Sequence, residues 1–190
     1  MSLTHPMQAN HLTSQTLHRF FTALAERDSQ GMLNCYAHGV RFEDPVFNLN
    51  GEREIMGMWA LLFGHVGLSR ERKNKNQRDR PTVWSVEFHT VKTLHNHGSV
   101  RWEASFRYAP TGRVVHNGVY SQFHFDEDGL ILSQRDNFDF WRWARQAYGI
   151  VGMMIGWTPM MWDHAREQAE VSLQEVLTEQ AMSVAAVQPL

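Results

Sequence analysis

Four strand patterns follow one another along the middle of the chain, and they limit the possible folds more than any other feature. They cover Thr82–Leu94, Ser99–Tyr108, Val114–Phe125 and Leu130–Phe138. Short turns containing glycine, such as Asn96-His97-Gly98, separate them, so we expect each strand to pair with the next in antiparallel fashion. Within the second pattern apolar and polar residues alternate, which is typical of a strand with one buried and one exposed face.

Three helical patterns precede these strands. The first has apolar residues at i, i+3, i+4 and i+7, namely Leu17, Phe20, Phe21 and Leu24. Asp28 and Asn50 are suited to cap the second and third helices, and Gly39 is expected to end the second. Helices followed by a long meander predict an α+β domain. A strongly curved antiparallel sheet wrapped by three N-terminal helices forms a cone, and its open end leads to a pocket of small-molecule size.

The C-terminal part of the chain has a different composition. A helix capped by Asp139 and closed by Gly149 is expected to end the domain. We therefore expect an N-terminal tail over residues 1–12, one domain over 13–148 and a helical extension over 149–190 that is rich in aromatic residues and methionine. Its tryptophans and methionines favour core or dimer packing, or alternatively a lid over the pocket mouth.

Charge and cysteine usage exclude several classes of function. The formal net charge is -2 and Cys35 is the only cysteine, so no intrachain disulfide or cysteine-based metal cluster is possible. The basic stretch Arg70–Arg80 has no aromatic residues and is interpreted as a solvated loop. The longest apolar run, Ile150–Trp157, is far shorter than the ~20 residues of a membrane span. We expect a cytoplasmic protein that binds neither nucleic acid nor membranes and holds no metal.

Two aspartates are the candidate catalytic residues. Asp44 precedes Pro45, and Asp136 lies near the end of the last strand pattern; both have the side-chain parity of the apolar face. Burial raises the pKa of a carboxyl group, which suits it for acid or base catalysis near neutral pH. Two simpler interpretations remain open: Asp44 as a residue that only caps a turn, and Asp136 as a buried partner of Arg135 or of a backbone amide.

From these patterns the chain, over roughly residues 13–143, resembles the SnoaL-like, or nuclear transport factor 2-like, superfamily with its cystatin-like fold. Residues 18–46 resemble ketosteroid isomerase, and the phrase Glu43-Asp44-Pro45-Val46 implies that Asp44 occupies the position of the catalytic base. The oxyanion-hole and supporting positions of that family hold Phe20, Ser121 and Trp59 here, while Tyr36 is retained. A lost oxyanion donor costs roughly 10²–10³ in rate, so steroid isomerisation itself is not expected.

Residues 110–113 and 135–139 resemble limonene epoxide hydrolase, which implies that Asp136 helps to activate water. That family's arginine and second aspartate fall on Trp102 and Ala104 in one alignment, and on Arg101 and Glu103 in an alignment shifted by one residue. Parity favours an outward direction for Arg101 and Glu103, which only a β-bulge would reverse. The water-positioning residues of that family fall on Phe42 and Asp44.

Together these observations predict a pocket protein that performs acid–base proton transfer on a small apolar molecule without a cofactor. Isomerisation, cyclisation and epoxide or ester hydration all remain open, as does a non-catalytic binding or interaction module on the same fold. We expect a homodimer, formed through the outer sheet face or the extension. The residues expected to line the pocket around Asp44 and Asp136 are Phe20, Tyr36, Phe42, Trp59, Trp102, Ser121, Phe123, Gln134 and Phe138.

Overall fold

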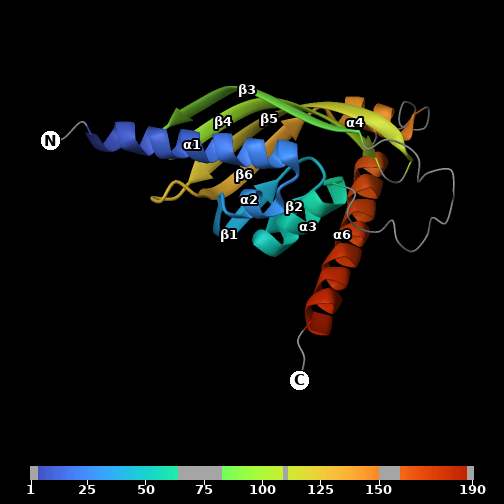
Figure 1. Ribbon diagram of the computed structural model, residues 1–190. Helices are drawn as coiled ribbons and strands as arrows, with labels where there is room; N and C mark the ends of the chain where they lie inside the picture. The colour runs from blue at the N-terminus through green and yellow to red at the C-terminus, as the bar shows by residue number, and fades with distance from the viewer. Residues whose placement is uncertain (1–3, 64–82, 109–110, 150–158, 188–190) are drawn as a thin grey trace.

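The computed structural model describes residues 4–63, 83–108, 111–149 and 159–187 (Figure 1). The elements are, in chain order, α1 (Thr4–Glu26), α2 (Ser29–Leu33), β1 (Tyr36–Glu43), β2 (Asn48–Asn50), α3 (Glu52–Phe63), β3 (Trp84–Leu94), β4 (His97–Tyr108), β5 (Arg113–Phe125), β6 (Ile131–Phe138), α4 (Phe140–Tyr148) and α6 (Pro159–Val187). The basic stretch Arg70–Arg80 and residues 150–158 of the predicted extension lie outside the described residues.

The strands form one curved sheet in the order β2-β1-β6-β5-β4-β3. The predicted meander is confirmed, because β3 to β6 pair antiparallel with their sequence neighbours. The α+β class is confirmed as well. One pairing differs from the antiparallel prediction: β1 runs parallel to β6. The short strand β2 was not predicted, since three residues are too few to give a recognisable periodicity.

Helix α1 packs on the inner face of the sheet. Its apolar stripe is fully buried, and Phe21 stacks on Phe88 of β3 and contacts Trp102 of β4. The helix begins at Thr4, within the residues 1–12 that the sequence assigned to an N-terminal tail. Thr13 lies inside this helix, where its hydroxyl donates to the Asn10 carbonyl.

The sequence predicted that Gly39 ends the second helix, and this prediction is wrong. Helix α2 already stops at Leu33, and Gly39 lies within β1 with a positive φ of 70°. The register between β1 and β6 shifts between Tyr36 and Arg41, so Gly39 sits in an irregularity of the strand. A residue without a Cβ adopts this backbone conformation at little cost, which is why a bulge and a helix end share the same sequence signal.

The two C-terminal helices close one end of the molecule. Helix α4 is capped as predicted: the Asp139 side chain accepts from Arg142 N, and Gly149 N donates to the Arg145 carbonyl. Helix α6, drawn in red in Figure 1, packs along α3. At this contact Gly57 offers no side chain, and Leu173 and Leu177 fill the space above it. Part of the predicted extension is therefore packed against the N-terminal helices.

Candidate active site

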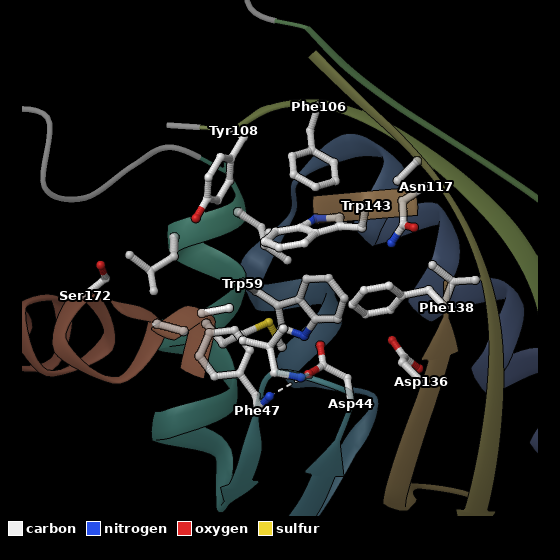
Figure 2. A pocket seen from close by; sticks show the side chains of 18 of the residues that line it. Asp44, Phe47, Trp59, Phe106, Tyr108, Asn117, Asp136, Phe138, Trp143 and Ser172 are labelled. Atoms are coloured by element: carbon white, nitrogen blue, oxygen red, sulfur yellow. Dashed lines mark hydrogen bonds between the residues drawn. The ribbon is translucent and has the colours of Figure 1, made fainter. Parts of the chain in front are cut away.

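A cavity of about 460 Å³ lies between the inner face of the sheet, α3, α4 and α6. This volume is within the range that a small organic ligand needs. Most of its wall is apolar, and Figure 2 shows the aromatic side chains that surround it. The described residues that line it include Phe42, Asp44, Phe47, Trp59, Trp84, Trp102, Ala104, Phe106, Arg107, Tyr108, Asn117, Val119, Asp136, Phe138, Trp143, Gln168, Ser172 and Glu175.

Asp44 both caps a turn and lines the cavity. It follows β1 directly, and its backbone N donates to the Phe47 carbonyl (2.9 Å). Its Oδ1 accepts from the backbone N of Val46 and of Phe47, each at 2.6 Å, and this fixes the carboxyl group in place. Oδ2 has no hydrogen bond to any described residue. The turn interpretation from the sequence is thus correct, and it does not compete with a pocket position.

Asp136 is held by two chains of hydrogen bonds. In the first, Trp102 Nε1 donates to Ser121 Oγ (2.7 Å), which donates to Asp136 Oδ1 (2.5 Å). In the second, Tyr36 Oη donates to Gln134 Oε1 (2.8 Å), and Gln134 Nε2 donates to both oxygens of Asp136 (3.1 Å each). The second chain starts at Trp59, whose Nε1 donates to Tyr36 Oη at 3.2 Å.

The direction of both chains is fixed by their first members. An indole N–H can only donate, so Ser121 and Tyr36 must accept from the tryptophans and pass their own protons onward. Gln134 then presents its NH₂ group to Asp136. These residues account for three of the five buried polar side chains in the described part of the chain, namely Ser121, Gln134 and Asp136. Every donor in this network therefore ends on the Asp136 carboxyl group.

Both carboxyl groups have raised pKa values. Burial raises the pKa of Asp136 to about 6, although the Ser121 and Gln134 donors partly offset this effect. Burial raises the pKa of Asp44 to about 7, and the nearby charge of Asp136 contributes in the same direction. The Phe47 and Val46 amides and, more weakly, Arg166 of α6 lower it. In the pH interval between the two pKa values, one carboxyl group of the pair is therefore ionised and the other is protonated.

The structure divides the expected pocket residues into two groups. Phe42, Trp59, Trp102 and Phe138 lie on the cavity surface beside Asp44 and Asp136. Phe20, Tyr36, Ser121, Phe123 and Gln134 do not: they lie behind that surface, and their prediction as lining residues is corrected. Parity placed Ser121, Phe123 and Gln134 on the inner face correctly, but α1 covers this part of the sheet. There Phe20 packs against Tyr36, Trp59 and Phe123.

Arg101 and Glu103 face away from the cavity. The pairing of β4 with β5 runs from His97 to Tyr108 without a register shift, so no bulge turns them inward. Both are exposed, while Trp102 and Ala104 lie on the cavity surface. The Arg135 guanidinium does not pair with the Asp136 carboxyl group; it donates to Glu43 Oε1 (2.7 Å) on the outer side. The part of the cavity wall that β4 forms here, at Trp102 and Ala104, is therefore apolar.

Sequence reasoning missed the polar residues at the cavity's other end. Asn117 of β5 shares the inward parity of Val119 and Ser121, and this parity could have identified it. The α6 residues Gln168 and Ser172 could not have been assigned, because periodicity identifies a helix but not the surface that it covers. Helix α6 also contacts the Asp44 turn, since Arg166 Nε donates to the Pro45 carbonyl (3.3 Å).

A curved sheet and helices that enclose an apolar cavity with buried carboxyl groups define a class of small-molecule pocket folds. Within that class, residues 17–134 match the family model of the SnoaL-like domain, and the chain belongs to this family. A comparison with curated protein sequences gave no match.

Similar solved structures support this fold. An LEH-like epoxide hydrolase from M. tuberculosis has a TM-score of 0.53 and 16% identity, with 77% of this chain and 98% of that chain covered. A protein with a ketosteroid isomerase-like fold from Catenulispora acidiphila, in complex with trimethylamine, has a TM-score of 0.52 and 10% identity, with 70% and 92% covered. A protein with a cystatin-like fold from Silicibacter pomeroyi has a TM-score of 0.50 and 13% identity, with 80% and 92% covered. At these identities the likeness shows the fold alone.

In the part of the chain that the structure describes, no helix has the length and apolar character needed to span a membrane.

Proposed function

We propose that this protein is an enzyme that transfers protons within an apolar small molecule or between it and water, without a cofactor. The observation that carries this proposal is the pair of carboxyl groups, Asp44 and Asp136, on one apolar cavity with pKa values of about 7 and 6. Asp136, which has the lower pKa and accepts from Ser121 and Gln134, is the proposed carboxylate, and Asp44 is the proposed acid. A pair of carboxyl groups with separated pKa values supplies a base and an acid at the same pH.

Epoxide hydration is the reaction that this pair supports best. Asp136 takes a proton from a water molecule as the water oxygen bonds to one epoxide carbon. The bond from that carbon to the epoxide oxygen breaks, and Asp44 donates its proton to this oxygen. The product is a diol, and a proton exchange with solvent restores both carboxyl groups. Asp44 would thus supply the acid that the apolar residues Trp102 and Ala104 cannot supply.

The isomerisation of an unsaturated ketone is the second candidate reaction on the same residues. Asp136 would remove a proton next to the carbonyl and return it to the far carbon of the shifted double bond, and Asp44 would donate a hydrogen bond to the enolate oxygen between these steps. The buried Ser121 hydroxyl cannot help, because it donates to Asp136 and lies behind the cavity surface. One donor stabilises an enolate less than two, which favours hydration over isomerisation.

A non-catalytic binding module is the alternative outside the enzyme class. The apolar wall at Trp102 and Ala104 favours it, because the two charged residues that would complete a triad are replaced by side chains with no acid or base function. In that case the cavity would bind an apolar ligand, and the carboxyl groups would only orient it.

The test is turnover of styrene oxide, cyclohexene oxide and a β,γ-unsaturated cyclohexenone, followed by mass spectrometry in isotope-labelled water. We expect label in the diol and a loss of at least about 10²-fold in Asp136→Asn and in Asp44→Asn. The exposed Asp128, replaced by Asn, serves as the matched control. Binding of these compounds without turnover would favour the binding module.

We also propose that the protein forms a homodimer through the outer face of the sheet. Tyr120 is 38% exposed there, and the Arg101 guanidinium lies 5.6 Å from its ring centroid. An exposed aromatic residue packed by arginine is a common component of protein interfaces. Light scattering should give twice the chain mass for the wild type and the single chain mass for Tyr120→Lys.

A further inference from the structure

The cavity has a second polar end, which the proposed reaction does not use. Asn117 lies on the inward face of β5, where Val119 pairs with Phe138 and Ser121 pairs with Asp136 of β6. Phe138 therefore lies between the Asn117 amide and Asp136, an arrangement that can be followed in Figure 2. A strand rises about 3.3 Å per residue, so Asn117 and Ser121 are separated by roughly 13 Å along the sheet.

The tryptophans on the cavity surface show which donors the protein leaves open. Three of the four donate their indole N–H to protein acceptors: Trp59 to Tyr36 Oη, Trp102 to Ser121 Oγ, and Trp84 to the Ala25 carbonyl. The fourth, Trp143, is held by ring contacts with Phe138 and Tyr108. No described residue accepts a hydrogen bond from Trp143 Nε1, and none bonds to the Asn117 side-chain amide.

Arg107 adds positive charge to the cavity wall at this end of β4. Its Nη1 donates to the Gly112 carbonyl (2.7 Å), and its Nε is buried with no hydrogen-bond partner among the described residues. Polar groups in a protein interior are normally paired, and donors that the protein leaves unpaired beside a cavity are suited to a ligand. An oxygen that accepts hydrogen bonds is the group that complements these donors.

We propose that Asn117 and Trp143 bind a carbonyl oxygen at one end of the substrate while the carboxyl pair acts on the other end. For the reacting end, this inference rests on the proposed function. It defines the substrate as an elongated apolar molecule with two oxygen functions. Asn117 and Ser121 are roughly 13 Å apart along the strand, and the side chains and hydrogen bonds at both ends take up part of this length, so the two substrate oxygens would be roughly 10 Å apart. Asn117 is then a specificity-determining residue.

The probe that tests this is a biphenyl with an oxirane ring at one para position and an acetyl group at the other. Its partner carries an ethyl group in place of the acetyl, so the two probes differ only in the distal oxygen. Dissociation constants can be measured from quenching of the cavity tryptophans. A neutral hydrogen bond is expected to make the acetyl probe bind roughly three- to tenfold more tightly to the wild type.

Asn117→Leu should remove this preference and leave the affinity for the ethyl probe within about twofold. Asn48→Leu, at an exposed asparagine of the edge strand β2, is the matched control and should keep the preference. Equal binding of both probes by the wild type, or an unchanged preference in Asn117→Leu, would overturn the inference. Oxirane opening is measured separately: a preference for the acetyl probe without turnover refutes the proposed reaction and leaves the role of Asn117 standing.

Discussion

Replacing Asp44 by asparagine should make the protein more stable at neutral pH and less active. The substitution preserves the turn, because the asparagine Oδ1 can accept the same two hydrogen bonds from Val46 N and Phe47 N. What it removes is an ionisable group in an apolar wall. The effect on stability therefore depends on pH, and its sign and size follow from the pKa of Asp44.

In the unfolded chain this carboxyl group loses its proton near its usual pKa of 3.8, whereas in the folded protein it keeps it until about pH 7. Between these values the folded state binds more protons, so the free energy of unfolding falls as the pH rises. The difference of about 3 pKa units at 1.36 kcal/mol each corresponds to about 4 kcal/mol. Asp44→Asn does not incur this loss.

Urea unfolding of both proteins from pH 4 to pH 8 measures the effect. We expect the stability difference to change in favour of Asp44→Asn by about 1.4 kcal/mol per pH unit up to pH 7 and to stay constant above it. Asp128→Asn should show no such trend, because Asp128 is exposed. If wild type and Asp44→Asn lost stability in parallel, Asp44 would have an ordinary pKa and could not be the proposed acid.

Three further predictions concern the same cavity. The rate of epoxide hydration should rise through about pH 6 as Asp136 loses its proton and fall through about pH 7 as Asp44 does, and a plateau extending to pH 9 would contradict these roles. Gln134→Met should move the acidic limb of the pH–rate profile to higher pH, because Asp136 loses a donor. It should also lower the free energy of unfolding by roughly 1–3 kcal/mol, because Tyr36 loses its acceptor as well. Gln174→Met on the exposed face of α6 is the control, and an acidic limb that does not move would refute the role of Gln134. Gly57→Val should weaken binding of the biphenyl probes severalfold, because a Cβ at this position would lie 2.9 Å from Leu173 Cδ1 and push α6 away from the cavity. Unchanged affinity together with a lowered melting temperature would show that α6 only stabilises the fold.

The sequence predicted the parts of this fold that depend on local patterns. Alternation identified β3 to β6, and it correctly placed Trp102 inward and Arg101 outward. It also placed Asp44 and Asp136 on the inner face. It could not distinguish a residue on the cavity surface from one beneath it. Ser121 and Gln134 share the parity of true lining residues, but whether space remains beside them depends on where α1 packs.

The C-terminal extension shows a second limit. The sequence predicted a helical extension over 149–190, and Leu173 and Val176 of α6 are buried. The partner of this helix is the surface of α3 around Gly57, and nothing in the local pattern of either helix indicates this contact. A wall of the cavity was therefore absent from the sequence-based picture. The alternatives were core or dimer packing and a lid over the pocket mouth, and none of them named α3 as the helix against which α6 packs.

The assignment of acid and base rests on residues that no sequence motif connects. Trp102 and Trp59 can only donate, so both hydrogen-bond chains reach Asp136 as donors and favour its carboxylate form. Among the described residues, Oδ2 of Asp136 accepts only from Gln134 Nε2, so this oxygen keeps a lone pair that can take a proton from water. Asp44 receives two backbone donors on one oxygen, while its other oxygen is open to the cavity and can carry the proton. The hydrogen-bond geometry therefore supports the proposed roles, with Asp136 as the base and Asp44 as the acid.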